Sequence, residues 1–163
     1  MTEERTAIQD VYPDDVAHCY GCGRLNEHGH RIRSFWDGDE TVARFTPDPS
    51  HTAVPGTVYG GLIASLVDCH GTGSAALAAA RAEGIEPGPG TDPARVPRFV
   101  TASLRVEYER PTPLGPELEV RGRIVERTDR KVVVRETVRA GRETTATGRV
   151  VAVRMPGDTS GGS

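Results

Sequence analysis

One acidic side chain, Asp68, stands in a segment whose other residues are almost all small or apolar. The segment runs from Gly60 to Arg81 and reads GGLIASLVDCHGTGSAALAAAR. A carboxylate among such neighbours is costly to bury unless a partner or a reaction uses it. A carboxylate can act as a general base toward water or as a nucleophile. Asp68 is therefore the first candidate catalytic residue, and its structural alternative is a carboxylate bonded to nearby hydroxyls such as that of Thr72.

Two glycines, Gly60 and Gly61, stand where this segment begins. If the segment is a helix, its first backbone N–H groups have no intrahelical acceptor, and the positive end of the helix dipole lies there. Such a terminus can bind the oxygen of a substrate carbonyl as its negative charge develops. Close helix packing is the structural explanation of the glycines. Together with Asp68, they favour catalysis.

The spacing of the two features sets a geometric condition. Asp68 lies eight residues after Gly60, which corresponds to about 12 Å along a helix. A catalytic base must come within about 3 Å of its water or substrate. One chain cannot bring both groups to the same carbonyl, so the helix start must come from a second subunit. We therefore expect at least a dimer.

The elements that position these residues follow from the pattern of the chain. The run 60–81 is apolar on nearly every face, which is typical of a helix buried all round. Alternation of apolar and polar residues predicts four long strands after it. Two short runs before it, with Gly38 in the turn between them, predict a hairpin. The strands are expected within 100–110, 116–128, 131–140 and 143–155, and the hairpin within 31–37 and 41–45.

This order of elements predicts an α+β fold in which an antiparallel sheet wraps around one central helix. In the first long strand, Val100, Leu104 and Tyr108 are expected on one face and Thr101 on the other. Residues 1–18 are expected to form an N-terminal arm, residues 19–155 the domain, and residues 156–163 a disordered tail. Open strand edges favour pairing with a second copy of the chain.

Composition limits the classes of partner. The chain has 163 residues, enough for one domain, and a formal net charge of -3. This charge gives no indication of nucleic-acid binding or of attraction to an anionic membrane, so a small molecule is the expected partner. No stretch is expected to be a membrane span, and the N-terminus is polar where a signal peptide would be apolar. Three cysteines, an odd number, fit a reducing compartment, so a cytoplasmic location is expected.

Several segments resemble a known family. GTVYGGLIASLVD at 56–68 is similar to the signature of the PaaI-like and THEM-like hot-dog thioesterases of the 4-hydroxybenzoyl-CoA thioesterase superfamily. CYGCG at 19–23, LNEHG at 25–29 and TASLRVEYERPTPLG at 101–115 resemble other parts of the same family, so the resemblance covers roughly residues 18–155. It implies a hot-dog fold, acyl-CoA thioester hydrolysis without a cofactor or metal, and a homodimer or homotetramer with sites between subunits.

The resemblance also implies roles for individual residues. Gly60 would donate the oxyanion-hole hydrogen bond, Asp68 would be the general base or nucleophile, and Thr101 would hold the attacking water. Arg130 and Lys131, in the segment RTDRK, would contact the phosphates of coenzyme A. A solvated turn is the structural alternative for these two basic residues.

Tyr59 departs from the family pattern, which has histidine at this position. A phenol can donate a hydrogen bond, but near neutral pH it does not supply the cation that histidine offers. A non-catalytic protein that binds acyl-CoA or a small aromatic molecule is therefore the main alternative function, and a hot-dog hydratase ranks below it. His70, about 200° around the helix from Asp68, is expected to be a core histidine.

The pair Cys19 and Cys22 has the Cys-x-x-Cys spacing of a zinc site, with His28 and His30 following. The His-x-His spacing is shorter than in the usual zinc fingers, so a packed turn is the preferred interpretation. A zinc-dependent interaction module remains an alternative. Cys69 is expected to be a small buried apolar residue.

Overall fold

The apolar segment forms one helix, α1 (Gly60–Ala82), which is the only α-helix among the described residues 4–156 of this computed structural model. Its side chains are buried on all sides along most of its length. Glycine, alanine and serine dominate the buried positions, and these small residues let the helix lie close to the elements around it. The predicted central helix is confirmed, and its last residue is one position beyond the expected end.

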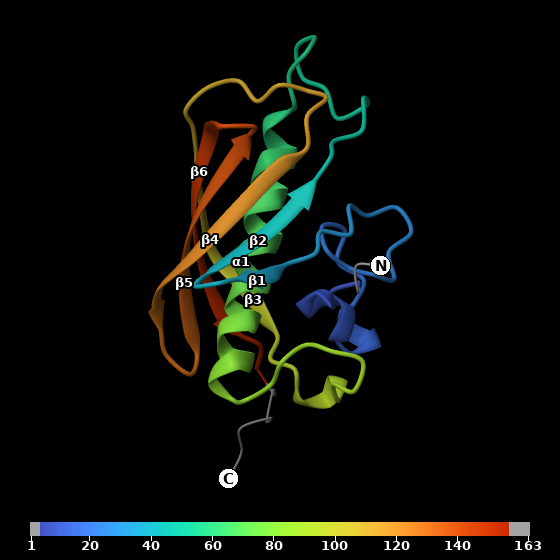
Figure 1. Cartoon of the computed structure of the whole chain (residues 1–163), viewed down its shortest axis with the longest axis vertical. Helices are drawn as coiled ribbons and strands as arrows, with labels where there is room; N and C mark the ends of the chain where they lie inside the picture. Colours follow the sequence, from blue (N-terminus) through green and yellow to red (C-terminus); the bar gives the residue numbers. More distant parts are fainter. Residues whose placement is uncertain (1–3, 157–163) are drawn as a thin grey trace.

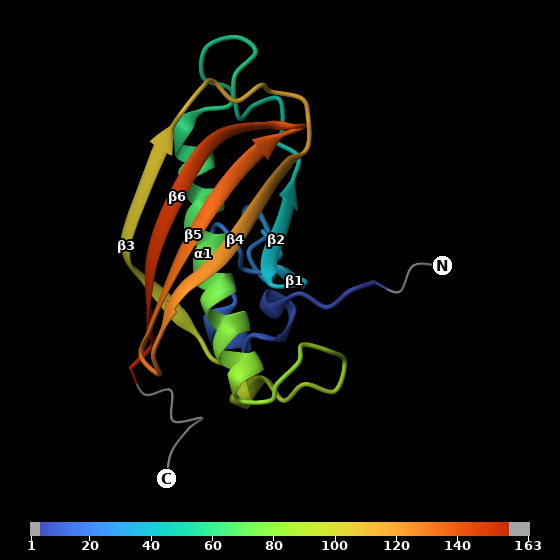
Figure 2. The same cartoon turned by 60° about the vertical axis from the view of Figure 1, so that its left-hand side comes forward.

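Six strands form one antiparallel sheet around this helix (Figures 1 and 2). Their order across the sheet is β1-β2-β4-β5-β6-β3. The predicted hairpin and the four predicted long strands are all present. The bounds are β1 (Phe35–Asp37), β2 (Glu40–Phe45), β3 (Phe99–Tyr108), β4 (Leu118–Arg127), β5 (Lys131–Ala140) and β6 (Glu143–Arg154).

Close contacts between glycine and valine set the distance between helix and sheet. A Cβ atom on Gly71 of α1 would lie 2.5 Å from a methyl carbon of Val150 on β6. In the reverse arrangement, a Cβ atom on Gly148 of β6 would lie 2.3 Å from a methyl carbon of Val67 on α1. Real Cβ atoms do not approach other atoms this closely, so both positions require glycine.

The N-terminal segment, residues 4–34, precedes β1 and lies against α1 on the side away from β5 and β6 (Figure 1). It contains two short 3-10 helices, η1 (Ile8–Val11) and η2 (Asp14–Val16). Ile8 and Tyr12 are fully buried members of the core. This segment therefore supplies part of the apolar cover of the helix. The expected tail lies almost wholly outside the described residues, which end at position 156.

By length and composition, α1 meets the usual criterion for a membrane span, contrary to the expectation that no stretch would. Its most apolar stretch is, however, 83% buried inside the protein. A core helix that is covered on all sides has this composition for the same reason as a membrane helix, because neither faces water.

The last strand in the sheet order, β3, leaves apolar side chains exposed at an open edge. Val100, Leu104 and Tyr108 are 42%, 40% and 53% exposed. The strand pairs with β6 along one side and has no strand neighbour on the other among the described residues. An open edge with exposed apolar side chains is a surface on which another chain can pair.

Candidate active site

The first candidate residue, Asp68, lies beside β3. The Thr101 hydroxyl donates a hydrogen bond to Asp68 Oδ1. Asp68 is half-buried. The Thr72 hydroxyl instead donates to the backbone carbonyls of Asp68 and Cys69, at 3.4 and 3.2 Å. The structural alternative expected a nearby hydroxyl on this carboxylate. The hydroxyl is that of Thr101 and not that of Thr72.

A register shift in β3 explains how Thr101 and Tyr108 both reach the helix. Strict alternation placed Thr101 and Tyr108 on opposite faces of the strand, and the structure shows this to be wrong. Both side chains bond to α1, Thr101 at Asp68 and Tyr108 at the Gly60 carbonyl. The pairing of β3 with β6 slips between Thr101 and Ser103. A bulge of this kind inserts one residue and changes which face the following side chains occupy.

The start of α1 forms the second part of the site. Tyr59 is the N-cap residue, and no side chain caps the helix there. Gly60 and Gly61 are exposed, and they lie at the positive end of the helix, where the first N–H groups have no intrahelical acceptor. The Tyr108 hydroxyl donates to the Gly60 carbonyl at 2.6 Å, which ties the helix start to the end of β3.

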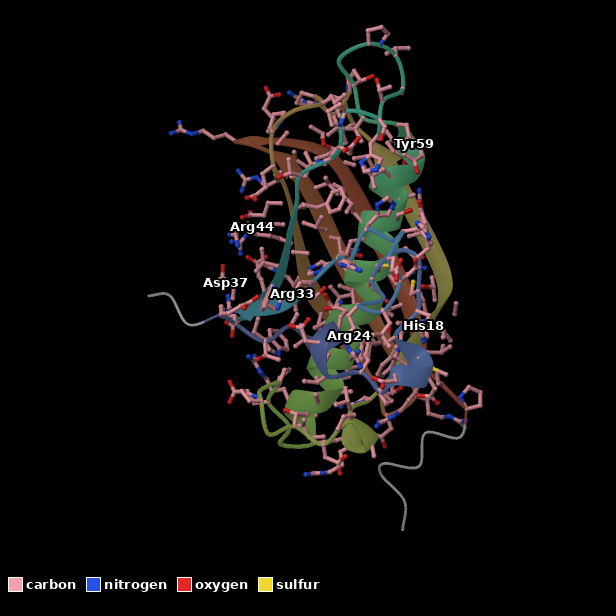
Figure 3. The ribbon with its side chains drawn as sticks, turned by 90° about the vertical axis from the view of Figure 1, so that its right-hand side faces the viewer. His18, Arg24, Arg33, Asp37, Arg44 and Tyr59 are labelled. Carbon is pink, nitrogen blue, oxygen red and sulfur yellow. The ribbon has the colours of Figure 1, made fainter. Side chains whose placement is uncertain are left out.

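Tyr59 occupies the surface at this helix start (Figure 3). Its ring lies over Gly61, where an added Cβ atom would come within 2.5 Å of the ring carbon Cε2. The side chain is 39% exposed. The residue that replaces the family's histidine is thus placed next to the candidate oxyanion-binding amides.

Two separate halves of a site therefore lie along one chain. Asp68 and Thr101 form one half, and the Gly60 and Gly61 amides beside Tyr108 form the other. Because α1 is continuous between Gly60 and Asp68, the two halves are about 12 Å apart along the axis. The described chain does not bring them to one carbonyl, as the spacing in the sequence predicted.

A buried carboxyl group, Glu136 of β5, lies between the sheet and α1. A Cβ atom on Gly71, three residues after Asp68, would be 2.9 Å from Glu136 Oε2. Glu136 is 2% exposed, and neither carboxyl oxygen has a hydrogen-bond partner among the described residues. Burial raises the pKa of Glu136 well above its usual value, and the negative charge of Asp68 raises it further. Burial therefore favours the neutral form of the Glu136 carboxyl group.

Arg130 lies in the turn between β4 and β5, and Lys131 is the first residue of β5. Lys131 pairs across the sheet with Val153, which also pairs with Val100, the neighbour of Thr101. The turn is thus at the same end of the sheet as the Asp68 half of the site. Arg130 is exposed, and the Lys131 ammonium group is 3.0 Å from Glu126.

His70 is a core residue, as expected. It is fully buried, with the Ser34 hydroxyl 2.9 Å from Nδ1 and the Thr41 hydroxyl 3.1 Å from Nε2. Burial lowers its pKa to about 4. A neutral imidazole with both nitrogens bonded inside the core has no access to the site.

The structure adds three residues that the sequence did not indicate. Tyr108 was placed on the wrong face, because the bulge has no clear signal in the sequence. Glu136 occupies an inward position in the strand pattern KVVVRETVRA, and a charged residue at such a position could have identified it.

Cys69 brings its sulfur to those of Cys19 and Cys22, and the three Sγ atoms lie within 4.8 Å of one another. Neither His28 nor His30 belongs to this group.

Comparisons with known proteins agree with this architecture. The sequence profile of the thioesterase superfamily matches residues 55–147. A thioesterase superfamily protein from Shewanella loihica PV-4 is 48% identical, with 88% of this chain and 98% of that chain covered and a TM-score of 0.66. The comparison with curated proteins gave no match.

More distant structures share the fold. The PaaI protein from the phenylacetic acid degradation operon of E. coli is 15% identical, with 78% of this chain and 82% of that chain covered and a TM-score of 0.61. A thioesterase from Haemophilus influenzae is also 15% identical, with 82% and 85% covered and a TM-score of 0.63. The expected hot-dog fold is thereby confirmed.

Proposed function

Since the chain belongs to the thioesterase superfamily, we propose that it hydrolyses an acyl-coenzyme A thioester, with Asp68 as the general base or nucleophile. The observation that carries this proposal is the hydrogen bond from Thr101 to the half-buried Asp68 carboxylate. A half-buried carboxylate held by one hydroxyl can accept a proton from a bound water.

In the general-base route, Asp68 removes a proton from water as the water oxygen bonds to the thioester carbonyl carbon. The carbonyl oxygen becomes negative and accepts hydrogen bonds from the exposed N–H groups at the start of α1. Collapse of this intermediate breaks the carbon–sulfur bond. The products are a carboxylic acid and the thiolate of coenzyme A, which takes the proton held by Asp68.

This route requires a homodimer as the smallest active unit. The Asp68 half of the site must meet the helix start of a second subunit, because the two halves of one chain are about 12 Å apart. The exposed apolar side chains of β3 lie at an open sheet edge beside both halves. Pairing of two chains along this edge would extend the sheet and cover Val100 and Leu104. A homotetramer built from such dimers is compatible with the same site.

Coenzyme A carries several phosphate groups, and the turn with Arg130 and Lys131 is at the Asp68 end of the sheet. We propose that these two side chains bind coenzyme A phosphates through charge-assisted hydrogen bonds. We also propose a cytoplasmic location, because three free cysteines fit a reducing compartment.

The alternative function is binding without hydrolysis, and Tyr59 is the observation that favours it. Its ring covers Gly61 at the helix start, where the family pattern has histidine. A protein of this kind would bind an acyl-CoA or a small aromatic molecule in the same site.

A panel of acyl-CoA thioesters, with released thiol as the readout, tests hydrolysis. We expect wild-type protein to hydrolyse at least one member and Asp68→Asn to lose that activity. Asp39→Asn, which changes an exposed carboxylate in the β1–β2 turn, is the matched control and should keep it. Absence of turnover across the panel, together with binding of a non-hydrolysable acyl-CoA thioether, would favour the binding function.

Subunit mixing tests the shared site. Gly60→Pro removes the first amide of α1 at a position where proline suits the helix geometry. We expect Asp68→Asn and Gly60→Pro each to be inactive alone, and their mixed dimers to regain activity because one of the two sites is intact. Activity in a monomeric fraction would contradict the dimer.

A further inference from the structure

Three cysteine sulfurs from two separate parts of the chain meet beside α1. Cys19 and Cys22 belong to the N-terminal segment, and Cys69 follows Asp68 in the helix. Their Sγ atoms all lie within 4.8 Å of one another, and those of Cys19 and Cys69 are 3.8 Å apart. We propose that Cys19, Cys22 and Cys69 form a zinc-binding site.

The spacing of the sulfurs fits this metal. Zinc binds thiolates at about 2.3 Å in tetrahedral geometry, which separates two ligand sulfurs by about 3.8 Å. The distance between the Cys19 and Cys69 sulfurs, 3.8 Å, equals this value. The Cys22 sulfur lies within 4.8 Å of both. A zinc ion therefore fits among the three sulfurs with small movements of the side chains.

A tight backbone turn holds Cys19 and Cys22 close together. The Gly23 N–H donates a hydrogen bond to the Cys19 carbonyl at 2.7 Å. Gly21 allows the Cys69 sulfur to approach this turn, because a Cβ atom at position 21 would lie 2.3 Å from Cys69 Sγ.

The charge around the cluster suits a metal bound by three thiolates. Such a complex carries one net negative charge, and the Arg98 guanidinium acts on Cys22 in the direction that lowers its pKa. Arg98 also lies over the Tyr12 ring, 4.5 Å from its centre.

An orphaned polar group provides an independent indication of a ligand. Tyr12 Oη is buried and has no hydrogen-bond partner among the described residues. Tyr12 interacts electrostatically with all three cysteines. Buried hydroxyls nearly always have a partner. Three thiolates leave one tetrahedral position for water or another small ligand, and such a ligand would be a partner for this hydroxyl.

The histidines of the same segment are placed elsewhere. His28 is exposed, and the His30 ring packs edge-on against Tyr20, Phe45 and His51. His18, which precedes Cys19, is also exposed. It lies away from Tyr59, the residue at the start of α1 (Figure 3). The proposed site is thus made of sulfur ligands from the chain, and it joins the N-terminal segment to the helix next to Asp68.

Metal content and cobalt binding test the site. The full chain, purified under reducing conditions, should contain one zinc per chain by elemental mass spectrometry. After removal by a chelator, titration with Co²⁺ should give thiolate-to-cobalt charge-transfer absorption that added Zn²⁺ abolishes. Cys22→Ser and Cys69→Ser should each lose stoichiometric binding, whereas His28→Ala, a matched change in the same segment, should keep it.

A second measurement does not depend on the folding of the variants. In the wild-type protein, Zn²⁺ should slow alkylation of all three thiols, which mass spectrometry follows residue by residue. Equal alkylation rates with and without Zn²⁺, or no cobalt charge-transfer band, would overturn the proposal. A Cys19–Cys69 disulfide under the same reducing conditions would also overturn it, since the pair would then be a redox site.

Discussion

The Thr101 hydroxyl donates its hydrogen bond to Asp68 across the contact between β3 and α1. Replacing Thr101 with valine removes this donor and keeps the shape of the side chain. A hydrogen bond to a charged group contributes about 1.5–3 kcal/mol, so we expect kcat/KM to fall about 10- to 100-fold. Thr101→Ser keeps the hydroxyl and should keep most of the activity. Equal losses in both variants would show that the methyl group, and not the hydroxyl, matters.

Tyr59 is the departure from the family pattern, and Tyr59→His restores the histidine beside the helix start. An imidazole can donate a charge-assisted hydrogen bond to the developing oxyanion, which a phenol does less well. We expect kcat/KM on the best thioester to rise about 10-fold. Tyr59→Phe should match wild type. A loss in Tyr59→Phe as large as that in Asp68→Asn would show that the Tyr59 hydroxyl itself takes part.

Glu136 should make stability depend on pH. Its pKa is raised in the folded protein by burial and by Asp68 of α1, the one charged group known to act on it among the described residues. A group with a raised folded pKa contributes stability below its unfolded pKa of about 4.3, and this contribution is lost as pH rises through the folded value. Glu136→Gln cannot ionise.

We therefore expect the difference in unfolding free energy between Glu136→Gln and wild type to shift in favour of the variant as pH rises from about 4 to 8. Urea unfolding curves at several pH values measure this difference. A difference that stays constant across the range would mean that Glu136 ionises in the folded protein at its usual pKa.

The glycine contacts between helix and sheet predict a cost for added methyl groups. Gly71→Ala would place a carbon 2.5 Å from Val150 and 2.9 Å from Glu136. Overpacking of this kind typically destabilises a protein by about 1–3 kcal/mol. Gly90→Ala is the matched control, because nothing lies within 4 Å of a Cβ atom there. Urea unfolding at one pH compares the two, and an unchanged midpoint for Gly71→Ala would show that the helix can move.

Four arginines form a row across the outer face of the sheet. Arg123, Arg135, Arg149 and Arg105 are cross-strand neighbours on β4, β5, β6 and β3. Like charges directly opposite each other destabilise a sheet, by up to about 1 kcal/mol for each pair. Arg149→Thr removes the charge that faces two others and should raise the unfolding midpoint at low salt.

High salt should reduce this gain because it screens the repulsion. Arg142→Thr, in the exposed turn before β6, is the control and should have no such effect. A stabilisation of Arg149→Thr that is independent of salt would point to strand propensity as the cause.

The sequence predicted the architecture well because its periodic signals were strong. The apolar run 60–81 and the alternation in 131–140 each identify an element without reference to the rest of the chain. Asp68 and Gly60 were found because a charged residue and a glycine pair are unusual at those positions. Their separation along a helix also indicated a site shared between two subunits, because the rise per residue of a helix is fixed.

Features that depend on contacts between distant segments were not predicted. The β3 bulge moves Tyr108 to the helix side, and alternation alone cannot show an inserted residue. The approach of Cys69 to Cys19 and Cys22 depends on how the N-terminal segment crosses α1. The raised pKa of Glu136 follows from its burial without hydrogen-bond partners among the described residues, which only packing reveals.

The glycine and valine contacts at Gly71 and Gly148 leave α1 no room to slide or rotate against the sheet. New substrate ranges in descendants of this protein should therefore arise by changes in the loops at the two ends of the helix, while the backbone that carries Asp68 stays fixed. Selection for a different acyl group would then leave the glycines at these two contacts untouched and accumulate substitutions in the 83–98 loop and around Tyr59.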